Sequence, residues 1–120
     1  MIENYRNFQV GPDAFGITWQ IEFRWQQNGI SIRHSDTVDV KFFLSDGTNS
    51  EEKVIALPHP LLLSQAARTG RPVTDAQCMK FAALHLVKII ESGEDMEKTL
   101  ITLSASELED AASQLMDKNT

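Results

Sequence analysis

Phe15–Trp25 reads FGITWQIEFRW, and this stretch decides the fold. Apolar and polar side chains alternate strictly along it. The apolar members are Phe15, Ile17, Trp19, Ile21, Phe23 and Trp25. A period of two places every second side chain on the same face of a β-strand, so that one face is buried and the other is wet. We therefore predict a strand over 15–25 whose two tryptophans point into the core.

The next signal is Asn28-Gly29, the pair preferred in two-residue type I′ hairpin turns. A turn at this point predicts a second strand directly after it. In the resulting register Phe23 faces His34, and Arg24 faces Arg33. All apolar pairs then fall on one face of the hairpin, which agrees with the alternation.

Further strands and then helices follow along the chain. Alternation continues over Thr37–Leu44, and a short fourth strand over Lys53–Leu57 stops at Pro58. Each later helix has a start signal, either a proline in its first turn or a capping box. The helices are predicted at His59–Arg68, at Thr74–Glu91 and from Ser104 to about residue 117. Residues 94–103 fit a helical turn and then a short strand over Thr99–Leu103, and we leave them and residues 1–14 unassigned.

These elements predict an α+β fold class. An antiparallel β-meander of about four strands (about 15–57) precedes three helices (about 59–117) that pack on one sheet face. The chain has 120 residues, which is room for one domain and little more. An apolar content of 42% and a charged content of 23% are ordinary for a globular protein. We predict a single domain over residues 1–120.

The formal net charge is −6, and it is distributed unevenly. Residues 1–57 carry 5 basic and 8 acidic side chains, and residues 91–120 carry 2 basic and 8 acidic ones. Residues 58–90 carry 4 basic side chains and 1 acidic one. Non-specific nucleic-acid binding requires positive charge to neutralise phosphates. The overall charge therefore argues against a nucleic-acid partner, and only the basic middle segment favours one.

Cysteine usage and apolar runs bear on the compartment. Cys78 is the single cysteine, so an internal disulfide framework is excluded. The first ten residues contain no apolar run of signal-peptide length. The most apolar stretch, Phe81–Ile90, is too short to span a bilayer. We predict a soluble cytoplasmic protein with no membrane partner.

The outward side chains of the predicted sheet supply the candidate contact residues. Arg24 and Arg33 face each other there, and Asp39 lies beside Arg33. Two like charges directly opposite are mildly destabilising, so such a pair could hold a carboxylate or phosphate from a ligand or partner. Phe43 falls on the wet side of its strand, and His34 is close to the arginines. The alternative without a binding role is a solvated sheet face on which acidic neighbours compensate the charges of the arginines.

No motif predicts a catalytic residue, a cofactor or a metal site. The chain contains none of GxSxG, GxGxxG, GxxxxGK[ST], HExxH or CxxC. Cys78 and His85 lie two turns apart on one predicted helix and supply at most two metal ligands. An apolar helix raises the pKa of a thiol rather than lowering it. We predict no cofactor and no metal, and an enzyme is the less favoured class.

The helix predicted over Thr74–Glu91 is apolar on two sides, which is typical of a helix that is central to its domain or shared with a partner. Its second apolar stripe contains Cys78, Phe81, His85 and Ile89. Our first hypothesis is therefore a non-catalytic protein-interaction module that forms a homodimer. The contact would use the outer sheet face or this second stripe.

Two alternatives belong to other classes. The first is a small anion- or ligand-binding domain, or an enzyme, that grips its ligand with Arg24, Arg33 and His34. The second, less favoured, is a DNA-binding regulator built on the helices over 60–91. Ser64–Gly70 has a weak likeness to a helix-turn-helix motif, in which an alanine precedes a glycine by four residues.

Overall fold

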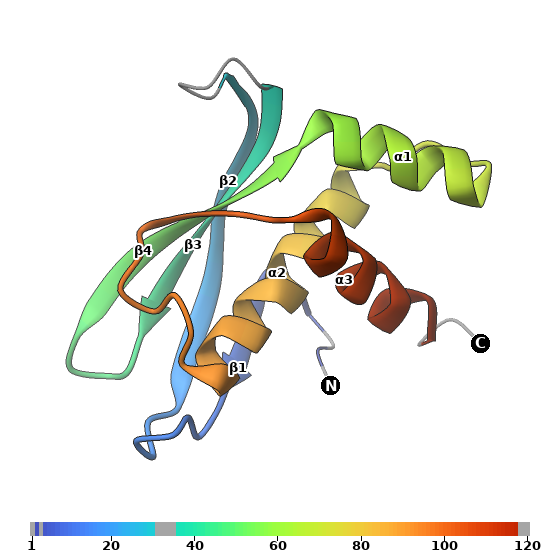
Figure 1. Cartoon of the computed structure of the whole chain (residues 1–120). Coiled ribbons are helices and arrows are strands. Elements are labelled where there is room, and N and C mark those ends of the chain that lie inside the picture. The colour runs from blue at the N-terminus through green and yellow to red at the C-terminus, as the bar shows by residue number, and fades with distance from the viewer. Residues whose placement is uncertain (1, 3, 31–35, 118–120) are drawn as a thin grey trace.

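In the computed structural model, residues 2, 4–30 and 36–117 are described. Four strands come first: β1 (Asn7–Val10), β2 (Trp19–Ile30), β3 (Asp36–Ser45) and β4 (Ser50–Pro58). The later elements are α1 (His59–Thr69), α2 (Asp75–Ser92), β5 (Leu100–Thr102) and α3 (Ala105–Asp117) (Figure 1). This content confirms the α+β class predicted from the sequence.

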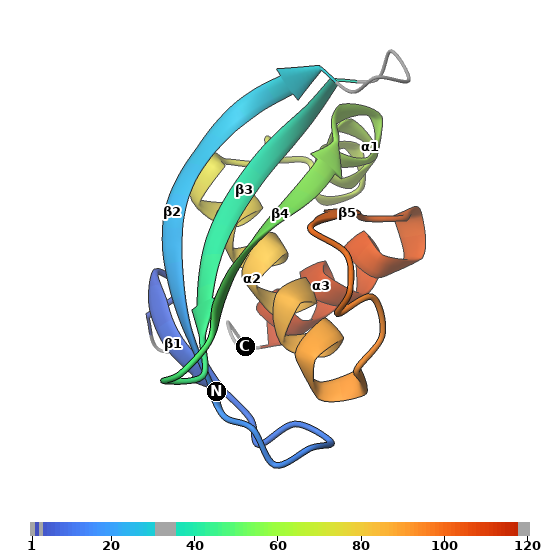
Figure 2. The ribbon, with the colours of Figure 1, turned by 90° about the vertical axis from the view of Figure 1, so that its left-hand side faces the viewer.

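The strands form one sheet in the order β1-β2-β3-β4-β5. Neighbours among the first four are antiparallel, as in a meander, but β5 runs parallel to β4. The sheet is therefore mixed and five-stranded across the described residues, where an antiparallel meander of about four strands was predicted. The helices lie on one side of it, with α2 directly on the sheet and α3 mainly on α2 (Figures 1 and 2). We call the opposite side the bare face.

The predicted hairpin turn at Asn28-Gly29 is wrong, because both residues lie inside β2. Asn28 pairs with Val38 and Gly29 pairs with Thr37, so β2 and β3 are direct neighbours. The apolar residues of β3 on the helix side are all buried: Val38, Val40, Phe42 and Leu44. Their burial specifies the register over the whole strand, and this outweighs the turn preference of two residues.

The two cross-strand pairs that depended on this turn are wrong as well. Phe23 pairs with Phe42 rather than with His34. Arg24 lies beside β3, so the register that placed it opposite Arg33 does not form. Arg33 and His34 themselves lie outside the described residues.

A β-bulge at Arg24 reverses the alternation of faces along β2. Phe23 and Trp25 pair with adjacent residues of β3, so that Arg24 is an extra residue. Beyond an extra residue, side chains that would have faced the core face the other way. Trp19 is buried, whereas Trp25 is 37% exposed and lies on the bare face. The prediction that both tryptophans point into the core therefore holds only for Trp19.

β2 begins later than predicted because a loop organised by Asp13 precedes it. One carboxylate oxygen of Asp13 accepts the backbone N–H groups of Phe15 at 2.8 Å and of Ile17 at 2.9 Å. The other oxygen accepts the indole N–H of Trp19 at 3.1 Å. The hydrogen bonds from Ile17, Trp19 and Phe15 lower the pKa of the Asp13 carboxyl. Phe15 stays outside the sheet and is 86% exposed.

α2 is the central helix and begins with the predicted capping box. The Thr74 hydroxyl accepts the N–H of Gln77 at 3.1 Å, and the Gln77 side chain accepts the N–H of Thr74 at 3.0 Å. The predicted second stripe is buried inside the chain: Cys78, Phe81, His85 and Ile89. Burial, helped by the charge of Asp75, raises the pKa of the Cys78 thiol to about 11. No helix in the described part of the chain has the length and apolar character to cross a membrane.

A buried lysine holds the segment between α2 and β5. Lys53 of β4 is 2% exposed and faces the helix side of the sheet. Its Nζ donates to the backbone oxygens of Met96 at 2.7 Å and Lys98 at 2.6 Å, and lies 3.4 Å from the Glu51 carboxylate. A buried charge requires partners of this kind. These contacts bring the segment alongside β4, where β5 adds to the sheet.

We predict that Lys53→Met lowers the free energy of unfolding by on the order of 1–3 kcal/mol, because two part-buried carbonyl groups lose their donor. Urea denaturation of the variant and the wild type measures the difference. Lys98→Met is the matched control, since it removes an exposed amino group from the same segment and keeps the Lys98 backbone oxygen. An equal loss in both variants would contradict the role given to Lys53.

Candidate interaction surface

Side chains on the bare face form rows that run across the strands. Pairing places Trp25 beside Lys41, Lys41 beside Val54, and Val54 beside Leu100. We call these four residues the apolar row. Trp25 is 37% exposed and Leu100 is 59% exposed. Large apolar side chains that line up on an uncovered surface are typical of an interaction site.

Lys41 lies in the middle of the apolar row, but its charge has partners on the same face. Its Nζ is 5.5 Å from the centre of the Trp25 ring, in a cation–π contact, and 3.3 Å from the Glu52 carboxylate. The charge is thereby matched within the face. The aliphatic stem of Lys41 is left to cover apolar surface between Trp25 and Val54.

A second row lies beside the first and consists of Glu22, Phe43 and Glu52. We call it the acidic row. The Arg24 guanidinium is 4.7 Å from the centre of the Phe43 ring and 3.6 Å from the Glu22 carboxylate. Consecutive residues of a regular strand face opposite sides, so only the bulge allows Arg24 and Trp25 to share this face.

Three of the five predicted contact residues lie on the bare face. Arg24 and Phe43 are in contact with each other. Asp39 lies further along β3, where it pairs with Gln27 and accepts a hydrogen bond from the Thr37 hydroxyl at 2.6 Å. The other two fall outside the described residues: Arg33 and His34. The charged partner of Arg24 is thus the acid Glu22. This is the charge compensation expected if the outer face is simply a solvated sheet surface.

Sequence reasoning missed the exposed members of the apolar row. Trp25 continues the alternation of Phe15–Trp25, and nothing local in the sequence marks the bulge that turns it outward. Leu100 belongs to β5, in a segment that the pattern left unassigned. The sequence could therefore indicate that an outer face exists, but not which large apolar residues lie on it.

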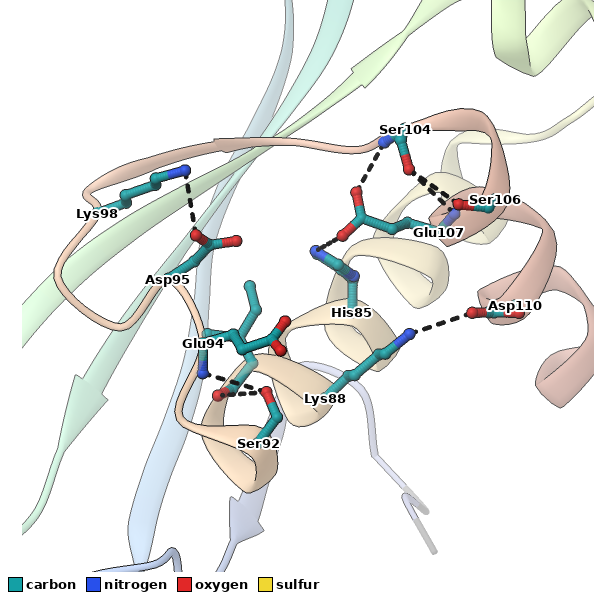
Figure 3. Close-up of polar contacts among 11 residues, drawn as sticks. His85, Lys88, Ser92, Glu94, Asp95, Lys98, Ser104, Ser106, Glu107 and Asp110 are labelled. Carbon is teal, nitrogen blue, oxygen red and sulfur yellow. Dashed lines mark hydrogen bonds and ion pairs between the residues drawn. The ribbon is translucent and has the colours of Figure 1, made fainter.

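A second group of polar side chains joins α2 to α3 (Figure 3). His85 of α2 is buried, and its Nε2 lies 3.5 Å from Oε2 of Glu107 in α3. The other carboxylate oxygen of Glu107 accepts the N–H of Ser104 at 2.9 Å, as part of the capping box predicted there. Lys88 and Asp110 form a more exposed ion pair at 3.1 Å. The group fastens α3 onto α2.

The protonation of His85 follows from its surroundings. Burial lowers the pKa of His85 below its ordinary value of 6.5, while the Glu107 carboxylate opposes that shift. The ring is therefore neutral at neutral pH, and its Nε2 has no hydrogen-bond partner among the described residues. No three His, Cys, Asp or Glu side chains in that part of the chain gather to hold a metal ion. We assign this group a structural role.

Acid should weaken the fold through His85. Its imidazole accepts a proton near pH 6.5 in the unfolded chain but only at lower pH in the folded one. The contribution of the neutral His85 ring to the free energy of unfolding is therefore fully present above pH 6.5, and it is lost as the pH falls below that value. Urea denaturation across this range should show that the wild type loses more stability than His85→Gln. Parallel losses in the two proteins would contradict this assignment, and an NMR titration of Glu107→Gln should show a still lower pKa for His85.

Comparisons of the chain with protein-family models, with curated proteins and with solved structures found no match.

Proposed function

We propose that this domain is a protein-interaction module that forms a two-fold homodimer through the bare face of its sheet. The observation that carries the proposal is the apolar row, in which Trp25, Lys41, Val54 and Leu100 lie in line across β2 to β5. The row is on the side of the sheet opposite the described helices (Figure 2). Covering this row removes exposed apolar area from water, which is the main driving force for association.

A second copy of the chain suits the charges of this face. Among the described residues, its charged side chains are two basic and three acidic: Arg24, Lys41, Glu22, Asp39 and Glu52. The face is therefore close to neutral, whereas the whole chain carries −6. Two acidic chains repel each other least where they meet through a nearly neutral surface. Because both signs occur side by side, a copy rotated by a two-fold axis can place its acids against the cations of the first.

The geometry of sheets also suits this contact. Two sheets that pack face to face lie about 10 Å apart with their strands roughly aligned, and their side chains interdigitate. The aromatic rings of Trp25 and Phe43 are each already accompanied by a cation. Such pairs offer large, rigid contact area at a low cost in side-chain entropy.

The other hypotheses have less support. The Arg24 guanidinium is already engaged by Glu22 and by the Phe43 ring, which argues against a free anion site there. The burial of α2 argues against DNA binding, since a helix-turn-helix motif needs its second helix exposed to enter the major groove. The buried second stripe of α2 likewise leaves the sheet as the favoured dimer surface.

Light scattering on a dilution series of the purified protein tests the dimer. We expect the wild type to approach twice the chain mass of 13.5 kDa. Leu100→Glu and Trp25→Glu should each return it to the chain mass, because a carboxylate would be buried unpaired in the contact.

Leu63→Glu is the matched control, since Leu63 is a large apolar residue that is 70% exposed on α1, away from the bare face. This variant should keep the wild-type mass. A wild type that stays at the chain mass at every concentration would refute the proposal. Dissociation by Leu63→Glu but not by Leu100→Glu would refute the choice of surface.

A further inference from the structure

A separate cavity lies in the helical layer, between α1, the start of α2 and α3. Its volume is about 620 Å³, within the range of small-molecule sites. Its buried apolar lining comes from two helices: Phe81 from α2, with Ala112 and Leu115 from α3. The polar lining comes from Gln65, Arg68, Thr69, Arg71 and Gln77. The cavity is thus apolar on one side and polar on the other.

Gln65 is the buried polar residue of this lining, at 8% exposed. Its Oε1 accepts a hydrogen bond from Nη2 of Arg68 at 2.9 Å. A guanidinium can only donate, so the oxygen of the amide must be the atom that faces Arg68. The NH₂ group of Gln65 therefore remains as a donor, and no described residue accepts from it.

Gln77 and Arg71 add donors of the same kind. Oε1 of Gln77 accepts the backbone N–H of Thr74 at 3.0 Å, so its NH₂ group is also left over. The Arg71 guanidinium has no acceptor among the described residues, whereas Arg68 is already paired with Glu109 at 2.5 Å. The unpaired N–H groups that line the cavity are therefore two amide NH₂ groups and one guanidinium, which carries a full positive charge.

We propose that this cavity binds a small oxyanion, a carboxylate or phosphate attached to a compact apolar body. The oxyanion accepts hydrogen bonds from Arg71, Gln65 and Gln77, and the apolar body lies on Phe81 and Leu115. An oxyanion offers only acceptors, so it complements the unpaired N–H donors of Arg71, Gln65 and Gln77. Arg71 is one of the four basic side chains of residues 58–90. The cavity lies on the helix side of the sheet, so it is independent of the proposed dimer.

Binding of phenyl phosphate, followed by NMR on the full chain, tests the proposal. Up to about 10 mM phenyl phosphate should shift the side-chain NH₂ resonances of Gln65 and Gln77 in a saturable way. Arg71→Gln should weaken this binding by at least about tenfold, because it removes the charged donor from an exposed position without disturbing the core. Lys80→Gln is the charge-matched control on α2: Lys80 lies outside the lining of the cavity and outside the group that fastens α3, so this variant should bind as the wild type does.

Two fragments of phenyl phosphate separate the contribution of its phosphate group from that of its phenyl ring. Inorganic phosphate should bind more weakly than phenyl phosphate, and phenol should not shift the two NH₂ groups. Inorganic phosphate that binds as tightly as phenyl phosphate would overturn the apolar part of the site. No saturable shift at Gln65 and Gln77, or an Arg71→Gln variant that binds like the wild type, would overturn the site itself.

Discussion

The bulge in β2 determines which side chains of this strand face the helices and which lie on the bare face. On one side of the bulge, Phe23 faces the helices, and its ring meets the ring of Phe42 edge-on at 6.2 Å. On the other side, Gln26 turns toward the helices and donates to the backbone oxygen of Asp75, at the start of α2, at 3.0 Å. A regular strand would direct Trp25 toward α2 in place of Gln26. One extra residue therefore supplies a polar contact to the central helix and delivers a tryptophan to the opposite face.

The parts of the fold that could be predicted are those whose signals are local. β3 and α2 match their predicted ranges within a residue or so, because alternation and a capping box are properties of consecutive residues. The register of β2 could not be predicted, since it depends on which residues of β3 become buried. β1 and β5 are short. β5 lies within the stretch Thr99–Leu103 that fits a short strand, but its place beside β4 depends on backbone hydrogen bonds to that strand and on the contacts of Lys53.

The same division applies to the candidate sites. Arg24 and Phe43 could be placed on the outer face, because their positions follow from strand periodicity. The cavity could not be found in this way, since its lining comes from three helices whose contact is a product of tertiary packing. The basic segment over residues 58–90 contributes Arg68 and Arg71 to this lining, but its charge alone does not indicate that they meet residues of α2 and α3.

Because Cys78 is the single cysteine and is buried on α2, its reaction with an alkylating reagent measures how often the packing around α2 opens. Cys78 is 3% exposed, and burial together with Asp75 raises its pKa to about 11. At neutral pH, roughly one thiol in ten thousand is therefore ionised in the folded state. Alkylating reagents attack the thiolate and need access to it, so they modify this residue only when the helix separates from its surroundings. The rate of alkylation then depends on how often α2 separates from the core. It therefore measures opening of the core, and no probe has to be introduced into the protein.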